Sequence, residues 1–147
     1  MTGITKREVR TEGAPAPLPF YSQGVVVGNM VYVSGSLAID PVTGEFVKGS
    51  VADRTTQILT NISNILKAAG TDLDKAVKLN VFLTDMANFS AMNEAYARFF
   101  TQGVRPVSSL LLKYGDSLTL ANKIRTCVAV KELPFGADVE IEASAHL

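Results

Sequence analysis

The feature that most constrains the fold is a helical pattern bounded by Ser50 and Gly70. Between them, apolar residues recur at i, i+4, i+7, i+8 and i+11: Ile58, Ile62, Ile65, Leu66 and Ala69. This spacing places all of them on one face of a helix. Ser50 with Asp53 three residues later resembles a capping box in which Asp replaces the usual Glu, and Gly70 is expected to end the helix. The chain therefore contains a long amphipathic helix that needs an apolar surface to pack against.

Strand patterns lie on both sides of this helix. Before it, Gly28-Asn29 is a hairpin-type turn between two β-branched runs at 25–27 and 30–34, and a second turn occupies 40–44. After it, apolar residues at alternate positions predict a strand with one strongly buried face: Val77, Leu79, Val81 and Leu83. The helix can therefore pack against a sheet.

A second helix is predicted over 88–100, where apolar residues again follow helical spacing: Phe89, Met92, Tyr96, Phe99 and Phe100. Two closing strands are expected at 126–131 and 139–145. The resulting order is β-β-α-β-α-β-β. Each strand–helix–strand step favours a right-handed crossover, which puts both helices on the same side of the sheet. We therefore predict an α+β fold, with a single mixed β-sheet and two helices packed on one face.

The opposite face of that sheet has no helix to cover it. Its strands nevertheless carry apolar residues at odd and at even positions, so that both faces of the sheet are partly apolar. An uncovered face of this kind is typical of an interface, so we expect other copies of the chain to bury it. The 147 residues fit one domain, 1–147.

Composition excludes several classes of protein. The 14 basic and 14 acidic residues balance, whereas proteins that coat nucleic acid usually carry a basic excess. The single cysteine, Cys127, cannot form an internal disulfide, which favours a reducing compartment: the cytoplasm, with the mitochondrial matrix as the alternative. The only histidine is His146, so no metal site built by the protein is expected. No apolar run is long enough for a membrane span, and the N-terminus lacks the apolar core of a secretory signal.

No general catalytic motif is present, but a few polar residues stand within or beside apolar strands: Tyr21, Ser34, Arg125, Cys127 and Glu140. Arg125 opens an apolar run and offers a planar fork of donors that matches a carboxylate. The plainer alternative is an edge arginine whose head lies in water. Glu140 and Glu142 point to one face, which is either solvated or part of a subunit contact. The alternative for Cys127 is a small buried hydrophobe.

Several segments resemble the Rid (YjgF-like) family, also called L-PSP endoribonucleases. The closing segment is the most specific, because an arginine leads through a strand of small residues to an aliphatic-Glu-Ile ending, here Val139-Glu140-Ile141. The matching segments, in chain order, are YSQGV (21–25), GNMVYVSG (28–35), AAG (68–70), KLNVFLTDM (78–86), FSAMNEAYARFF (89–100) and RTCVAVKELPFGADVEIEA (125–143). The resemblance thus covers nearly the whole chain.

The resemblance implies a YjgF-like (chorismate-mutase-like) fold and a homotrimer with active clefts between subunits. The RidA branch of the family hydrolyses enamine and imine intermediates, such as 2-iminobutanoate and 2-iminopropanoate, to 2-keto acids and ammonia. It requires no cofactor. On this basis Arg125 would bind the substrate carboxylate, Glu140 would hold or activate the attacking water, and Tyr21 would close the cleft. The remaining pocket residues would be Ser34, Gly35 and Cys127, with Asn93 in support.

The sequence departs from the family pattern directly before Arg125. In the family the arginine follows a proline and one small residue, whereas here 18 residues separate it from Pro106. We therefore predict an insertion at 107–124. It is either a real loop at the mouth of the cleft or an artefact of the gene model, such as a retained intron, and sequencing the transcript distinguishes the two.

Two other functions remain open. The family's older name implies RNA cleavage or inhibition of translation, although neutral charge and the lack of a base-stacking motif count against it. A non-catalytic, carboxylate-binding or chaperone-like trimer is the third alternative. Binding of a 2-keto acid without turnover of an imine would identify it.

Overall fold

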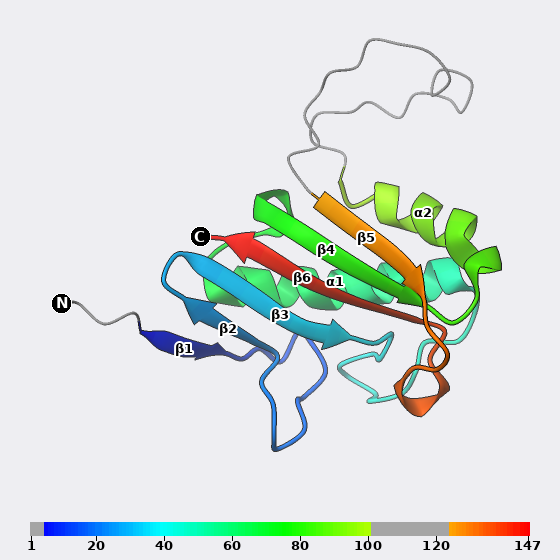
Figure 1. Ribbon diagram of the computed structural model, residues 1–147. Helices are drawn as coiled ribbons and strands as arrows, with labels where there is room; N and C mark the ends of the chain where they lie inside the picture. Colours follow the sequence, from blue (N-terminus) through cyan, green and yellow to red (C-terminus); the bar gives the residue numbers. More distant parts are fainter. Residues whose placement is uncertain (1–4, 101–123) are drawn as a thin grey trace, which may run out of the picture.

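The computed structural model describes residues 5–100 and 124–147. Within these residues, six strands form one sheet in the order β1-β2-β3-β6-β4-β5, and two α-helices pack on one of its faces (Figure 1). The strands are β1 (Lys6–Val9), β2 (Gly24–Val27), β3 (Met30–Ser36), β4 (Ala76–Leu83), β5 (Ile124–Ala129) and β6 (Val139–His146). The α-helices are α1 (Val51–Ala69) and α2 (Phe89–Ala97), with short 3₁₀ turns η1 (Leu73–Lys75), η2 (Met86–Asn88) and η4 (Pro134–Gly136). The predicted class, a mixed sheet with both helices on one side, is confirmed.

Helix α1 begins and ends where its sequence signals predict. The backbone N–H of Asp53 donates to the Ser50 hydroxyl (3.3 Å), and the Ser50 N–H donates to the Asp53 carboxylate (2.8 Å). At the other end Gly70 adopts φ 101°, a conformation that costs glycine little, and its N–H reaches the carbonyls of Leu66 and Lys67. Local chemistry therefore fixes both ends of the longest helix.

The last strand, β6, lies in the middle of the sheet. It pairs antiparallel with β3 on one side and with β4 on the other, so that β3 and β4 run parallel to each other. Helix α1 connects these two parallel strands, and α2 connects β4 to its parallel neighbour β5. Glu140 therefore stands on a central strand, whereas Arg125 stands on the edge strand β5.

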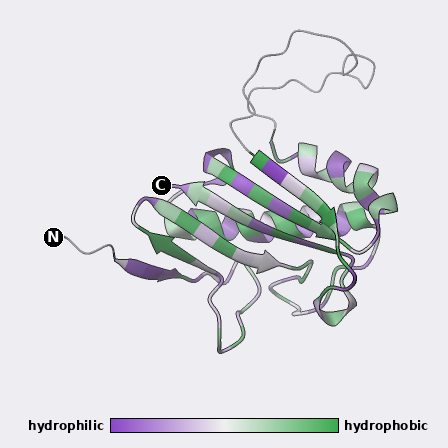
Figure 2. Cartoon of the chain, viewed as in Figure 1, coloured by the Kyte–Doolittle hydropathy of each residue, from purple (hydrophilic) through white to green (hydrophobic). Residues whose placement is uncertain are grey.

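The core lies between the sheet and the helices. Alternate residues of β6 are buried against them: Val139, Ile141, Ala143 and Ala145. The opposite face of β6 carries Glu140, Glu142 and Ser144, and Asn80 of β4 donates to the Glu142 carboxylate (2.5 Å). Polar and apolar positions alternate along these strands in Figure 2. Burial of this face by other copies of the chain stays a prediction.

Some elements differ from the sequence-based expectation. Strand β1 was not foreseen, because the segment KREV has no apolar alternation; it pairs antiparallel with β2, from Lys6 opposite Val27 to Val9 opposite Gly24. Helix α2 ends at Ala97 rather than at residue 100. Of the predicted insertion, residues 107–123 lie outside the described part of the chain. Neither α-helix of the described part has the length and hydropathy to cross a membrane.

Candidate active site

Among the predicted site residues, Gly35 leaves the space that the Glu140 carboxylate occupies. Strand β3 carries an irregularity in its pairing with β6 between Val33 and Ser36, and Gly35 falls within it. A Cβ atom at Gly35 would overlap the Oε1 of Glu140. Only glycine therefore lets the carboxylate of β6 lie against the backbone of β3.

A cavity of about 100 Å³ adjoins this contact, since Gly35 forms part of its wall. Tyr21 and Ser34 line the same cavity. The Ser34 hydroxyl donates to the carbonyl of Ser22 (2.6 Å), which ties β3 to the segment that carries Tyr21. Four predicted site residues, Tyr21, Ser34, Gly35 and Glu140, thus lie together, and we call them the glutamate cluster.

The environment of Glu140 makes its carboxyl group harder to ionise than that of an exposed glutamate. Burial, and to a smaller extent the negative charge of Glu142 two residues along the same face, raise the pKa of Glu140 above the ordinary glutamate value. A carboxyl group with a raised pKa can accept and return a proton nearer to neutral pH than an exposed glutamate can. Glu140 is therefore suited to general acid–base chemistry.

The second group of predicted site residues surrounds Arg125, and we call it the arginine cluster. Arg125 Nη1 donates to the Oδ1 of Asn93 on α2 (2.5 Å). Its guanidinium carbon lies 4.9 Å from the centre of the Tyr96 ring and 5.7 Å from that of Phe89. These cation–π contacts and the hydrogen bond orient the guanidinium at an exposed edge of the sheet. Within 5–100 and 124–147 its hydrogen bond uses Nη1 only, which leaves the other donors for a carboxylate.

Cys127 lies two residues from Arg125 on β5 and is half-buried. Burial raises the pKa of its thiol, and the charge of Arg125 only partly opposes this effect. The thiol therefore stays protonated at neutral pH, and a nucleophilic role finds no support. Among residues 5–100 and 124–147, no group of three or more His, Cys, Asp or Glu side chains is placed to hold a metal ion.

The two clusters occupy opposite faces of the sheet within one protomer. Glu140 pairs with Phe82 of β4, whereas Arg125 pairs with Leu79 of the same strand, three residues away. Because successive strand residues point to opposite faces, Glu140 and Arg125 do so as well. Strand β4 also separates β6 from β5, so two inter-strand steps of about 4.8 Å each lie between them. A single chain thus brings the predicted residues together in two groups, not in one.

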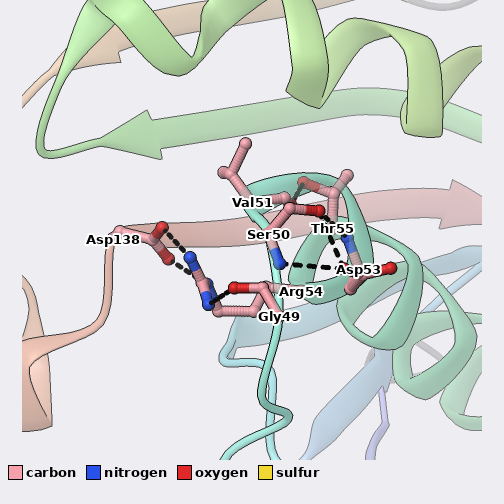
Figure 3. A network of polar contacts seen from close by, with 7 residues as sticks. All are labelled: Gly49, Ser50, Val51, Asp53, Arg54, Thr55 and Asp138. Atoms are coloured by element: carbon pink, nitrogen blue, oxygen red, sulfur yellow. Dashed lines mark hydrogen bonds and ion pairs between the residues drawn. The ribbon is translucent and has the colours of Figure 1, made fainter.

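One feature near the site was not foreseen. The Arg54 guanidinium of α1 donates twice to the Asp138 carboxylate (2.6 and 2.7 Å) and once to the carbonyl of Gly49 (2.7 Å; Figure 3). Asp138 directly precedes β6, so this pair ties the start of the strand that carries Glu140 to the first turn of α1. The partners lie 84 residues apart, and one sequence gives no signal that joins them.

The chain is similar to known proteins along nearly its whole length. The sequence model of the family described as Endoribonuclease L-PSP matches residues 11–147. A RutC family protein of Pyrococcus horikoshii is 40% identical over 141 residues, which cover 96% of this chain and 98% of that protein. A 2-iminobutanoate/2-iminopropanoate deaminase of Capra hircus is 39% identical over 145 residues, covering 99% and 93%. The crystal structure of E. coli TdcF with bound serine superposes with a TM-score of 0.78 at 34% identity, covering 96% of this chain and 98% of that one.

Proposed function

The chain belongs to the endoribonuclease L-PSP family, the Rid proteins, and from this membership and the two clusters we propose that it hydrolyses 2-imino acids. The substrates are the imine and enamine products that other enzymes release, such as 2-iminobutanoate and 2-iminopropanoate. The observation that carries the proposal is the Glu140 carboxylate held against Gly35 at the edge of a cavity.

The proposed reaction needs little more than a positioned water. The oxygen of water bonds to the imine carbon, and the carbon–nitrogen double bond becomes single. Glu140 takes a proton from the water and delivers it to nitrogen, which gives a carbinolamine. The hydroxyl proton of the carbinolamine then passes through Glu140 to nitrogen, the carbon–oxygen bond becomes double as the carbon–nitrogen bond breaks, and ammonia leaves a 2-keto acid. The raised pKa of Glu140 suits both transfers. Because an iminium carbon is already electrophilic, orientation supplies much of the remaining rate.

Arg125 is the proposed carboxylate anchor. Its contacts with Asn93, Tyr96 and Phe89 fix the direction of the guanidinium before the substrate arrives. Such preorganisation reduces the entropy lost on binding. Tyr21, half exposed beside the cavity, would close over the substrate.

A small imino acid cannot contact both clusters of one protomer, because they face opposite sides of the sheet. We therefore place the complete site between copies, with Arg125 and Cys127 from one and the glutamate cluster from the next. A homotrimer with clefts between subunits, which the family resemblance implies, meets this requirement. Cyclic assemblies join two different surfaces in this way.

The proposed insertion at 107–124 immediately precedes the carboxylate anchor. Removing 108–124 would join Pro106 and Val107 directly to Arg125, which restores the family spacing. The protein that lacks 108–124 should retain deaminase activity if the segment is a loop added to an intact site. If this deletion variant folds but hydrolyses no imine, the segment belongs to the site.

A coupled assay tests the proposal. A pyridoxal-phosphate dehydratase generates 2-iminobutanoate, and the release of 2-ketobutanoate is followed with and without the protein. We expect the purified protein to accelerate release and Arg125→Ala to abolish the acceleration. Release at the spontaneous rate with the folded, assembled protein would refute the proposed activity. A cytoplasmic location, expected from the single cysteine, stays a prediction.

A further inference from the structure

The cavity beside the glutamate cluster has a predominantly apolar wall. It lies between the segment before β2, the end of β3, α1 and the 3₁₀ turn η4. The larger apolar side chains that line it are Pro15, Pro17, Leu37, Ile39, Ile65 and Phe135. None of these residues has a role in the proposed hydrolysis, so the cavity needs an explanation of its own.

The two amide side chains of the wall, Gln23 and Asn61, are already engaged with the protein. The Gln23 amide donates to the carbonyls of Thr11, Ala14 and Pro15 at 2.9–3.1 Å, and its oxygen accepts from the N–H of Thr11 at 2.7 Å. Asn61 is engaged in the same way, donating to the carbonyl of Ile39 (2.9 Å) and accepting from the side chain of Gln57 (2.9 Å). An apolar group is therefore the better occupant, since it requires no new hydrogen bonds.

Phe135 stands at this cavity at a conformational cost. In the described part of the chain it is the only residue other than glycine with a positive φ, 58°. Its ring is 75% exposed, so burial within the chain does not offset that cost. Strained backbone and exposed aromatic surface in one residue are typical of binding positions. Phe135 is thus held at the cavity for contact with something outside the chain.

The cavity and the proposed reaction centre share Gly35. Glu140 lies against this residue, and the cavity wall includes it. A substrate whose imine carbon is near Glu140 can therefore direct its side chain into the cavity. A cavity of about 150 Å³ accommodates benzene, so one of about 100 Å³ suits a branched chain of three or four carbons better than an aromatic ring.

We propose that this cavity is a side-chain subsite, with Phe135 as its outer wall, and that it selects 2-imino acids with branched aliphatic side chains. The proposal rests on the proposed imine hydrolysis. It places the protein after a reaction that oxidises branched aliphatic amino acids to their imines, as flavin-dependent amino acid oxidases do.

An imine series tests the subsite. An amino acid oxidase with catalase generates the imines of alanine, leucine and phenylalanine in place, and semicarbazide trapping follows their decay. We expect kcat/KM for the leucine-derived imine to exceed that for the alanine-derived imine by about tenfold, and the phenylalanine-derived imine to be slower than the leucine-derived one. Equal rates for all three, or a preference for the aromatic side chain, would overturn the subsite.

Phe135→Gly distinguishes a subsite wall from a structural residue. Glycine relieves the positive φ, so the variant should melt at a higher temperature while losing most of the leucine preference. Phe135→Leu, which keeps apolar bulk, should retain part of the preference. Val42→Ala, which shortens a 91% exposed apolar side chain outside the cavity wall, should retain all of it. An unchanged preference in Phe135→Gly would overturn the assignment of Phe135.

Calorimetry separates failure of the subsite from failure of the proposed function. Pyruvate and 4-methyl-2-oxopentanoate are the product keto acids with a methyl and an isobutyl side chain. Tighter binding of the second, lost in Phe135→Gly, supports the subsite even if no imine is hydrolysed, in which case only the proposed activity fails. Turnover of the alanine-derived imine together with equal binding of both keto acids refutes the subsite alone.

Discussion

The glutamate cluster and the arginine cluster are held by different kinds of structure. Glu140 stands on a central strand with hydrogen-bonded neighbours on both sides, and the backbone of Gly35 fits against its carboxylate. Arg125 stands on the exposed edge strand β5, where, among the residues that the structure describes, side chains of α2 set its direction. The backbone therefore positions the proposed acid–base group, whereas side-chain contacts position the proposed anchor. Substitutions in the two clusters should consequently impair activity in different ways.

The largest effect is expected from Glu140→Gln. The amide cannot act as a general acid or base at neutral pH, so kcat should fall by about 10²- to 10⁴-fold, while product keto acids should still bind. Glu142→Gln is the matched control on the same strand and face, and it should retain activity because its amide can still bond to Asn80. Steady-state kinetics with 2-iminobutanoate measures both variants. Equal losses in the two would assign the effect to the sheet rather than to Glu140.

Arg125→Ala should lower kcat/KM by about 100-fold or more, which abolishes the acceleration in the coupled assay, because the substrate carboxylate loses its anchor and its orientation. Arg125→Lys should recover only part of this, since an ammonium cannot form the planar fork. Arg98→Ala removes an exposed arginine just after α2 and serves as the control. If Arg98→Ala causes the same loss, general electrostatic attraction explains the effect and the anchor role is wrong.

Arg54→Ala should act mainly on stability. Its ion pair with Asp138 is bidentate and about three-quarters buried, with 24% of each side chain exposed, so we expect a loss of about 1–2 kcal/mol in the free energy of unfolding. Thermal denaturation measures this loss, with Lys48→Ala, an exposed cation of the preceding loop, as the control. Activity should fall only a few-fold, because the pair holds the start of β6 and not the carboxylate itself. An unchanged melting temperature would refute this role of the pair.

The smallest expected effect is on the pH dependence of stability. The pKa of Glu140 is raised in the folded state, so ionisation of this group disfavours folding. Glu140→Gln should therefore increase stability at neutral pH. The gain should shrink as pH falls through the folded-state pKa and disappear below the ordinary pKa of glutamate, where both folded and unfolded chains are protonated. Urea denaturation at pH 7 and pH 4 measures the difference, and an equal gain at both would refute the assignment.

The sequence predicted what depends on local chemistry. The ends of α1 follow from Ser50, Asp53 and Gly70, and the buried face of β4 follows from alternation. Strand β1 was not predicted, because an edge strand of mostly polar residues shows no alternation of apolar and polar positions. The separation of Arg125 from Glu140 was not predicted either, because this separation depends on the position of β6 between β3 and β4 in the sheet. The Arg54–Asp138 pair was not predicted for the same reason, since strand order and tertiary contacts decide which distant residues meet.

The central claim is that Arg125 of one copy and the glutamate cluster of another form one site. Arg125→Ala and Glu140→Gln chains, each inactive alone, are unfolded together, refolded, and checked for mixed assemblies by native mass spectrometry. If the site lies between copies, random mixing in a cyclic trimer should restore about a quarter of the wild-type activity, since that share of interfaces pairs two intact contributions. If mixed assemblies form and activity stays at the level of the separate variants, the claim is contradicted.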